Sequence, residues 1–286
     1  MALIIDGKKI ASDIVLELKS EAEKLGIKPG LVVIMVGDDP ASAVYVRNKE
    51  KACERAGFYH RTHKLPESAT EEDVLLLLNN IANDCKVHGV IVQLPLPKHI
   101  NEENIINAIP VGKDVDCFHP LNVGKLLTKK KGDTPLLFAP CTPAGVMELL
   151  DRYNVEIAGK HAVIVGRSNI VGKPLSLMLL NRDATITMCH SRTEDLSKIV
   201  NLADIVIAAV GVPKLVREDM VKNGSIVIDV GVNRLPDGSL CGDVDFERVK
   251  EKAFAITPVP GGVGPMTIAM LLKNTLAVAK RHNVCE

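Results

Sequence analysis

The stretch from His161 to Arg192 constrains the fold more than any other part of the chain. It contains a short apolar run (161–165), a turn rich in glycine (166–172), an apolar segment (174–180) and a second run (184–189). Short β-branched runs bounded by glycine are typical of buried parallel strands, and the longer segment between them is typical of a buried helix. The order strand, turn, helix, strand predicts a βαβ unit, whose turn can hold a dinucleotide pyrophosphate.

The glycines of this turn depart from the usual GxGxxG pattern. Gly166 supplies the first glycine, Ser168 stands in place of the second, and Gly172 comes one residue late. Taken alone, the turn is also compatible with a tight connection that binds nothing. After the second strand an NAD enzyme places a carboxylate, whereas this chain has Ser191 and Arg192. A hydroxyl beside a guanidinium binds a 2′-phosphate, so the stretch favours NADP over NAD.

The composition excludes several classes of function. Lys+Arg and Asp+Glu both number 35, which gives no reason to expect nucleic acid or an anionic membrane as partner. Aromatic residues make up 3% with no Trp, and the apolar runs are too short to span a bilayer. The seven cysteines form no CxxC pair, which favours reduced thiols in the cytoplasm over disulfides or a metal site.

Helices and strands alternate along the rest of the chain. The first half predicts helices at 8–25, 42–56, 71–82 and 101–108 and strands at 31–36, 58–65 and 89–93; the second half predicts a helix from Pro140, strands at 204–211 and 225–231, and a last helix at 268–279. This alternation predicts an α/β fold with parallel sheets. We expect two domains with a cleft between them: an N-terminal α/β substrate domain (1–140 plus 266–286) and a C-terminal Rossmann-like NADP-binding domain (141–265).

Candidate catalytic residues lie in the first half. Tyr45 and Lys49 are four residues apart on one predicted helix and therefore share a face. A lysine beside apolar surface can have its pKa lowered enough for proton transfer, although a helix this rich in charge also fits a solvated face. Gln93 closes a buried strand, where a polar side chain must find a partner or face a crevice. Asp116 could bind a ring that carries N–H donors or could cap a turn.

Two further segments lie where a ligand could approach the backbone. Val232 follows the predicted strand 225–231, on the cofactor side of a parallel sheet. The segment from Pro258 to Thr267 combines three prolines with three glycines and runs into the last helix. Glycines allow close approach of a ligand, although a rigid connector between domains would have the same composition.

Taken together, the chain resembles the bifunctional methylenetetrahydrofolate dehydrogenase/methenyltetrahydrofolate cyclohydrolase family along essentially its whole length. The resemblance rests on segments 42–49 (SAVYVRNK), 92–97 (VQLPLP), 113–116 (KDVD), 140–143 (PCTP), 166–172 (GRSNIVG) and 258–267 (PVPGGVGPMT). It implies oxidation of 5,10-methylenetetrahydrofolate with NADP and hydrolysis of the methenyl product to 10-formyltetrahydrofolate. These reactions belong to one-carbon metabolism and purine biosynthesis.

The resemblance also assigns roles to residues. Lys49 resembles the cyclohydrolase lysine, Gln93 its hydrogen-bonding partner, Tyr45 the ring that stacks on folate and Asp116 the carboxylate that holds the pterin. The folate-binding set is Tyr45, Lys49, Val92, Gln93, Leu94, Asp116, Pro260, Gly261, Gly262, Val263, Gly264, Pro265, Met266 and Thr267. The NADP-binding set is Gly166, Arg167, Ser168, Ser191, Arg192 and Val232. No metal is implied, and the family suggests a homodimer.

One position departs from the family, and two alternatives stay open. After Asp116 the family usually has Gly, whereas this chain has Cys117, so a requirement for positive φ would strain the loop. One alternative is another NADP-linked dehydrogenase of the same architecture, acting on a small cyclic keto acid. The other is a non-catalytic dinucleotide-binding protein, since fold analogy alone excludes neither.

Overall fold

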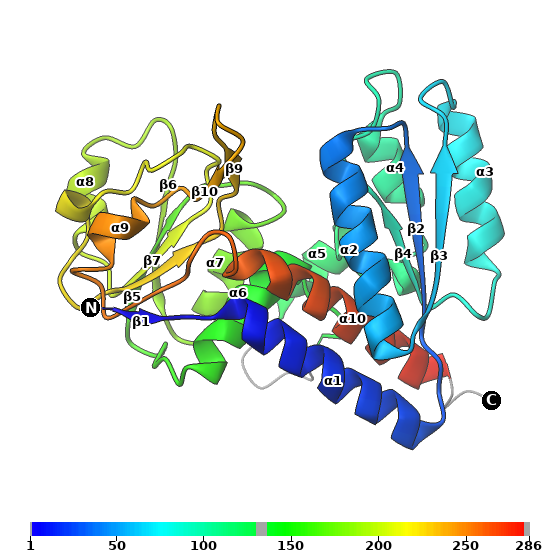
Figure 1. Cartoon of the computed structure of the whole chain (residues 1–286), viewed down its shortest axis with the longest axis horizontal. Helices are drawn as coiled ribbons and strands as arrows, with labels where there is room; N and C mark the ends of the chain where they lie inside the picture. The colour runs from blue at the N-terminus through cyan, green and yellow to red at the C-terminus, as the bar shows by residue number, and fades with distance from the viewer. Residues whose placement is uncertain (1, 130–135, 283–286) are drawn as a thin grey trace. The chain divides into compact units, whose positions relative to one another are not determined.

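The structure, a computed structural model, describes residues 2–129 and 136–282, which divide into two compact units (Figure 1). Residues 2–11, 126–129 and 142–267 form the large-sheet unit, and residues 12–125, 136–141 and 268–282 form the small-sheet unit. Several helices cross this division along the chain. The two-domain α/β organisation expected from the sequence is confirmed.

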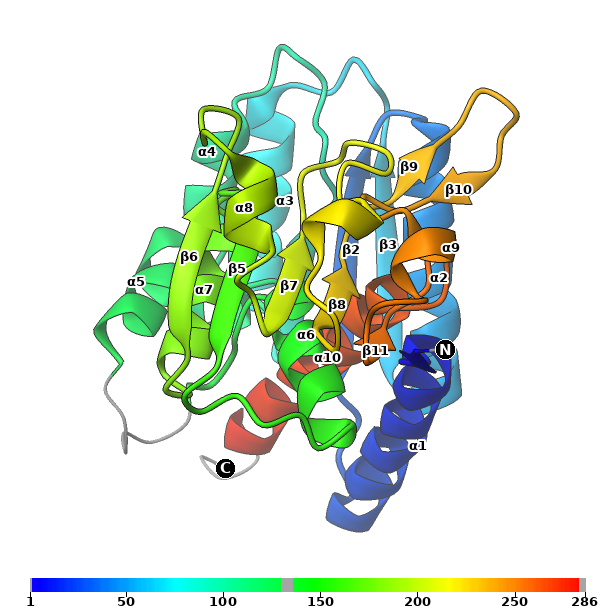
Figure 2. The ribbon, with the colours of Figure 1, turned by 90° about the vertical axis from the view of Figure 1, so that its left-hand side faces the viewer.

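The large-sheet unit is built on parallel strands in the order β1-β11-β8-β7-β5-β6, which Figure 2 shows with β6 on the left. Its strands are β1 (Leu3–Ile4), β5 (His161–Val165), β6 (Thr185–Cys189), β7 (Ile205–Ala208), β8 (Ile226–Asp229) and β11 (Ala255–Ile256), with a separate antiparallel pair β9 (Asn233–Arg234) and β10 (Leu240–Cys241). Its helices are α6 (Cys141–Arg152), α7 (Gly172–Leu180), α8 (Leu196–Val200) and α9 (Phe246–Val249), with the short 3₁₀ turn η2 (Glu218–Met220).

The predicted βαβ unit is confirmed almost residue for residue. Strands β5 and β6 pair in parallel with His161 opposite Thr185 and Val165 opposite Cys189, and α7 connects them. The central strands are buried on both faces because helices cover both sides. One face packs Val163, Val206 and Val227 against residues of α8, η2 and α9. This unit is Rossmann-like, with its loops gathered at the carboxyl ends of β5, β7 and β8.

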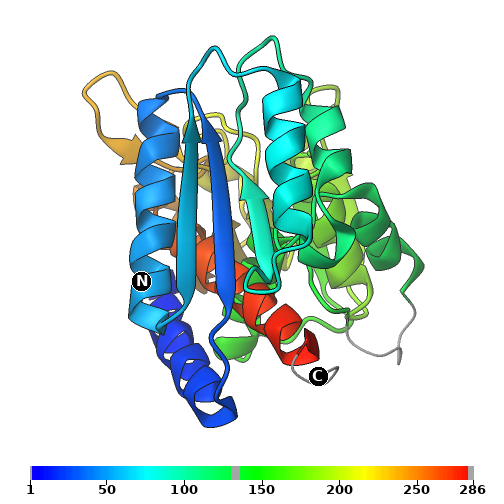
Figure 3. The ribbon, with the colours of Figure 1, turned by 90° about the vertical axis from the view of Figure 1, so that its right-hand side faces the viewer.

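The small-sheet unit has parallel strands in the order β3-β2-β4, and Figure 3 shows β2 in the middle. The strands are β2 (Gly30–Val36), β3 (Tyr59–Leu65) and β4 (Gly89–Val92). The helices are α1 (Gly7–Leu25), α2 (Pro40–Ala56), α3 (Glu71–Ala82), α4 (Glu102–Ala108), α5 (Pro120–Thr128) and α10 (Val263–His282), and η1 (Val111–Lys113) is a 3₁₀ turn. Helices α1, α5, α6 and α10 each continue from one unit into the other.

Alternation along β2 explains the two-sided core of this unit. Val32, Ile34 and Val36 face α3 and α4, and the residues between them are buried on the other side. Helix α2 begins with Pro40 after the N-cap Asp39, and it ends at Gly57 with φ 71°. Gly57 therefore acts as the predicted C-cap, a position that favours glycine because it is left-handed. These two residues set where α2 begins and ends.

The structure differs from the sequence expectations at both ends of the chain. The last helix begins at Val263, five residues before the predicted start at Ile268, because its first turn tolerates Pro265. At the other end, the chain forms a strand that the sequence did not predict, and residues 2–11 group with the large-sheet unit. The reason is β1, which pairs in parallel with β11. No described helix is long and apolar enough to cross a membrane.

Candidate functional site

A buried amine meets an amide where α2 passes the end of β4. Lys49 is 8% exposed, although its neighbours Arg47 and Lys51 are exposed, so it lies on the inner face of α2 and is not part of a solvated surface. Its Nζ donates a 3.0 Å hydrogen bond to Oε1 of Gln93. The other end of that amide is also fixed, since Nε2 of Gln93 donates to the carbonyl oxygen of Leu94 at 2.7 Å.

Asp116 adds a carboxylate to this group. Burial raises the pKa of Asp116, whereas the positive charge of Lys49 and a hydrogen bond with Cys141 lower it. The structure thus brings together residues from α2, the end of β4, the loop after η1 and the first position of α6. We refer to Lys49, Gln93, Asp116 and Cys141 as the Lys49 cluster; all four belong to the small-sheet unit.

Cys141 was not among the residues that the sequence singled out. The one thiol proton of Cys141 is shared between Asp116 and the carbonyl oxygen of Val115, which lies 3.2 Å from Sγ, and Nδ2 of Asn274 donates to the same carbonyl oxygen at 2.8 Å. Burial raises the pKa of the Cys141 thiol well above its ordinary value, so the group stays protonated. The available signal was its place in the motif 140–143, but a single cysteine carries no spacing that points to a role.

Other members of the predicted folate set surround the Lys49 cluster. Tyr45 lies one turn before Lys49 on α2 and is 46% exposed, so its ring is accessible. Val92 is buried as the last residue of β4, and Leu94 is partly buried. These two residues flank Gln93 along the chain and hold it at the strand end.

The loop that carries Asp116 is shaped by a second carboxylate. Asp114 accepts hydrogen bonds from the backbone N–H groups of Phe118 at 3.1 Å and His119 at 2.9 Å, and from Nδ2 of Asn122 at 2.8 Å. The loop closes with Cys117 at φ 59°. A buried cysteine therefore adopts the left-handed conformation here, which is uncommon for a residue with a side chain.

The turn after β5 has no room for a side chain at either of its two glycines. A Cβ on Gly166, whose φ is 128°, would lie 2.2 Å from the carbonyl oxygen of Ala209, and one on Gly172 would lie 2.3 Å from that of Gly166. Oγ of Ser168 accepts the N–H of Val171 at 3.2 Å, which leaves the hydroxyl proton free to donate. The turn therefore offers a close backbone approach and a donor at the start of α7.

Polar side chains are presented at the end of β6. Ser191 and Arg192 are exposed, and Arg192 forms no ion pair with any carboxylate in residues 2–129 or 136–282. Nδ1 of His190 accepts the backbone N–H of Arg192 at 3.1 Å, which fixes the turn. Arg167 is exposed on the neighbouring glycine turn, and Val232 is 47% exposed after β8. These residues belong to one unit and suit a phosphorylated dinucleotide.

The last predicted segment lies in the large-sheet unit, whereas the Lys49 cluster lies in the small-sheet unit. Pro260, Gly261 and Gly262 form a turn, with Gly261 at φ 108°. A Cβ on Gly262 would lie 2.6 Å from the carbonyl oxygen of Pro258. The remaining residues, Val263, Gly264, Pro265, Met266 and Thr267, are the first turns of α10.

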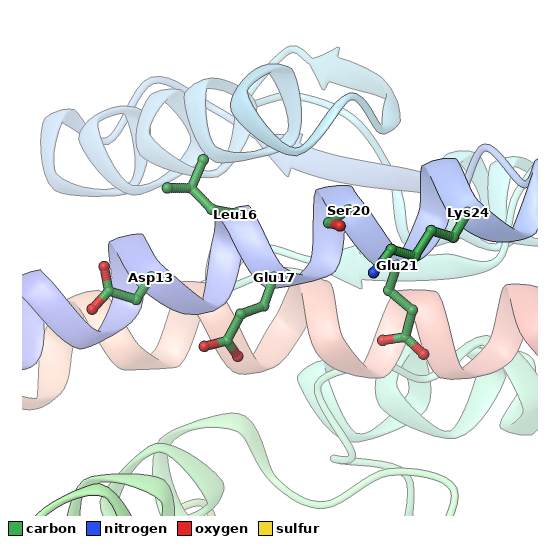
Figure 4. A pocket seen from close by; sticks show the side chains of 6 residues that line it. All are labelled: Asp13, Leu16, Glu17, Ser20, Glu21 and Lys24. Carbon is green, nitrogen blue, oxygen red and sulfur yellow. The ribbon is translucent and has the colours of Figure 1, made fainter.

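A surface hollow of about 590 Å³ lies elsewhere, along α1 (Figure 4). Its lining consists of Asp13, Leu16, Glu17, Ser20, Glu21 and Lys24. All of these residues come from one helix at helical spacing, and Lys280 pairs with Glu21 at 2.6 Å. The hollow is the solvated face of an amphipathic helix, and no predicted site residue lines it.

Two family models match the chain. The model described as tetrahydrofolate dehydrogenase/cyclohydrolase, catalytic domain, matches residues 5–116, and the model of the corresponding NAD(P)-binding domain matches residues 140–283. A curated relative, the bifunctional protein FolD of Moorella thermoacetica, is 55% identical over 283 residues, which cover 98% of this chain and 99% of the relative.

Solved structures agree with these matches. The FolD methylenetetrahydrofolate dehydrogenase/cyclohydrolase of Campylobacter jejuni is 50% identical, covers 98% of this chain and 99% of its own, and superposes with a TM-score of 0.93. The enzyme of Trypanosoma brucei, solved with NADP and an inhibitor, is 42% identical, covers 98% of each chain and also has a TM-score of 0.93.

Proposed function

The chain belongs to the tetrahydrofolate dehydrogenase/cyclohydrolase family, and we propose that it carries out both reactions of that family. The first reaction oxidises 5,10-methylenetetrahydrofolate to the methenyl cation with NADP. The second adds water to that cation, releases one proton and gives 10-formyltetrahydrofolate. The chain is thus a bifunctional oxidoreductase and hydrolase of one-carbon metabolism.

The observation that carries the proposal is the Lys49–Gln93 hydrogen bond inside the folded unit. Water adds to a carbon that already bears positive charge, so the step needs a proton acceptor more than further activation of the electrophile. We assign the acceptance of that proton to the amine of Lys49. Gln93 holds the amine in place, since its own amide is oriented by the bond to Leu94.

The other members of the small-sheet unit bind the folate. Asp116 accepts hydrogen bonds from the N–H groups of the pterin, which needs its ionised form. The exposed ring of Tyr45 stacks on the aminobenzoyl group. Cys141 holds Asp116 through its thiol and is a positioning residue. In the large-sheet unit, the segment 260–267 offers backbone that a ligand can approach closely, because it contains three glycines.

The large-sheet unit fits NADP. Bound there, the cofactor supplies the acceptor for the hydride that leaves the methylene carbon. Gly166 permits close approach of the pyrophosphate, and Ser168 donates its hydroxyl proton to it. Ser191 and Arg192 hold the 2′-phosphate, with Arg167 beside them. The task of these residues in hydride transfer is to position the ring, which is the main requirement of that step.

One assay tests the function as a whole. Purified protein is mixed with methylenetetrahydrofolate and NADP, and NADPH and the methenyl absorbance are followed together. We expect NADPH to form while the methenyl product is consumed. Oxidation of NADPH by a cyclic keto acid, with no NADPH formed from the folate, would contradict the proposal.

The assembly and location of the protein are proposed as well. We propose a homodimer formed through the large-sheet unit, supported by exposed apolar side chains such as Leu3 and Phe254, which adjoin one another through a 2.8 Å backbone hydrogen bond. A cytoplasmic location is supported by the dispersed cysteines, which suit a reducing compartment. Sedimentation at micromolar concentration should give twice the 30.9 kDa of the chain; a monomer would contradict the dimer.

A further inference from the structure

A buried carboxylate outside the proposed catalytic groups connects two loops of the large-sheet unit. Asp243 is fully buried between β10 and α9. Its Oδ2 accepts the backbone N–H groups of Val210 at 2.6 Å and Gly211 at 2.9 Å. Its Oδ1 accepts Nδ2 of Asn233 at 2.8 Å. One side chain thus holds the segment after β7 and the segment after β8 at once.

These two segments lie on the cofactor side of the sheet. Strands β7 and β8 are parallel neighbours, with Ala208 opposite Asp229, so the residues after them emerge at the same edge. The turn after β5 is at that edge too, because a Cβ on Gly166 would lie 2.2 Å from the carbonyl oxygen of Ala209. A shift of Val210 therefore acts directly on the backbone that receives the pyrophosphate. Ligands of parallel α/β sheets gather at this edge.

A second buried carboxylate fixes the segment that carries Asp243. Oδ1 of Asp229 accepts the N–H groups of Asp243 and Gly231, each at 3.0 Å, and Oδ2 accepts that of Val244 at 2.9 Å. The two carboxylates pack directly against glycines, with no room for a side chain there. A Cβ on Gly231 would lie 2.2 Å from Cγ of Asp243, and one on Gly242 would lie 1.8 Å from Oδ2 of Asp229. The segments are held rigidly, and the charge of Asp243 is balanced by hydrogen-bond donors.

We propose that Asp243 is a positioning residue for NADP, which sets the spacing between the loop at Val210–Gly211 and the loop at Gly231–Asn233. Val232 sits in the second loop, between Gly231, which Asp229 holds, and Asn233, which Asp243 holds, and its side chain is 47% exposed. Preset loops bind the dinucleotide without first having to be ordered, which improves affinity. This role rests on the proposed function, because it supposes that NADP binds at this edge.

The position of Asp243 predicts that disturbing its bonds affects the dehydrogenase and cyclohydrolase activities differently. NADP binding and hydride transfer depend on the loops that Asp243 holds. Water addition depends on the Lys49 cluster, which belongs to the small-sheet unit. A general loss of folding would lower both activities together, whereas loss of loop spacing would raise the KM for NADP and leave methenyltetrahydrofolate hydrolysis unchanged.

Two variants and one matched control test the proposal. Asn233→Ala removes the link to the second loop and keeps the bonds to Val210 and Gly211. Asp243→Asn replaces an acceptor by an NH₂ group that faces N–H donors. Asp204→Asn is the control, because Asp204 precedes the same strand β7 at its opposite end and accepts the N–H of His161 at 3.0 Å. Each is measured for NADP KM, kcat, cyclohydrolase rate, NADPH affinity by fluorescence, and thermal stability.

We expect Asn233→Ala to raise the KM for NADP and the Kd for NADPH by roughly tenfold, the usual scale for losing a supporting hydrogen bond to a charged group. Its cyclohydrolase rate should match wild type, and Asp243→Asn should show a larger effect of the same kind. Asp204→Asn should keep the wild-type KM even if its Tm falls. The proposal is overturned if the KM of Asn233→Ala is unchanged, or if both activities fall in proportion. If Asp243→Asn does not fold, Asn233→Ala decides alone. Wild-type turnover tests the proposed function separately.

Discussion

Nζ of Lys49 donates a 3.0 Å hydrogen bond to Oε1 of Gln93, although the two residues are 44 positions apart in the chain. The bond joins the inner face of α2 to the end of β4. It leaves the remaining protons of the amine for a substrate. Because Nε2 of Gln93 is engaged by Leu94, the amide cannot rotate without losing a second bond. The amine is thus held in one orientation before any ligand arrives.

The first prediction concerns Lys49→Met, which keeps the aliphatic stem and removes the amine. Cyclohydrolase activity should fall on the order of 10²–10⁴-fold or more, the range for deleting a general acid–base group. Dehydrogenase activity should fall less, because hydride transfer mainly needs positioning. Methenyl product should therefore accumulate. NADPH formation and decay of the methenyl absorbance are measured in the same preparation.

Lys51→Met serves as the control for this substitution. Lys51 lies on the same helix but is exposed, so its loss should leave both activities at the wild-type level. Hydrolysis of methenyltetrahydrofolate at the wild-type rate by Lys49→Met would show that the amine takes no part in the chemistry.

The second prediction concerns the choice between NADP and NAD. Arg192→Ala should weaken use of NADP more than use of NAD, by about 1–3 kcal/mol, because a charged partner of the 2′-phosphate is lost. The quantity to measure is kcat/KM for each cofactor. Arg217→Ala is the control, since Arg217 pairs with Asp219 on the surface. An equal loss of kcat/KM for both cofactors would show that Arg192 does not bind the 2′-phosphate.

The third prediction concerns the backbone at Cys117, which has φ 59°. A left-handed conformation costs an L-residue about 1–2 kcal/mol, and glycine avoids this cost. Cys117→Gly should therefore be more stable than Cys117→Ala by about 1 kcal/mol, despite the greater chain entropy of glycine when unfolded. The free energy of unfolding in urea is the measurement.

The same pair of substitutions at Cys53 provides the opposite control. Cys53 is equally buried but lies inside α2, where glycine costs roughly 1 kcal/mol relative to alanine. Alanine should be the more stable residue there. If alanine is more stable than glycine at both positions, the loop after Asp116 is not strained by its φ.

Much of the fold could be predicted because its strands are short apolar runs with clear ends. β5 matched its predicted bounds, since β-branched residues lie between charge and glycine. Strands β1, β9, β10 and β11 could not be predicted, because two residues carry no periodicity. The start of α10 was misplaced because Gly264 and Pro265 indicate a turn, although both fit the first turn of a helix.

The site was predictable in its residue types but not in its contacts. Spacing showed that Tyr45 and Lys49 share a helix face, but it could not show that this face is turned inward at Lys49. Whether Lys49 is buried depends on how α2 packs on the sheet. Its charged neighbours in the sequence suggest an exposed face instead. The contact of Cys141 with Asp116 joins residues 25 positions apart and depends entirely on where α6 begins.

The last prediction uses that contact. Ionised Asp116 is the form that accepts the N–H groups of the pterin. Burial raises its pKa, so use of the folate should decline on the acid side at a higher pH than for an ordinary aspartate. The hydrogen bond with Cys141 lowers the pKa of Asp116 and therefore favours the ionised form. Cys141→Ala removes that bond, so the pKa should rise and the acid limb should move to higher pH.

The measurement is kcat/KM for methylenetetrahydrofolate against pH in wild type and Cys141→Ala. At pH values above the acid limb, kcat/KM should be similar in wild type and Cys141→Ala, because Asp116 is ionised in both. Cys189→Ala is the matched control: its thiol is also buried, but it lies at the end of β6 and does not act on Asp116. A Cys141→Ala profile that is lower at every pH by one constant factor would mean that the thiol only packs. A shift of the limb to lower pH would mean that it does not stabilise the ionised carboxylate.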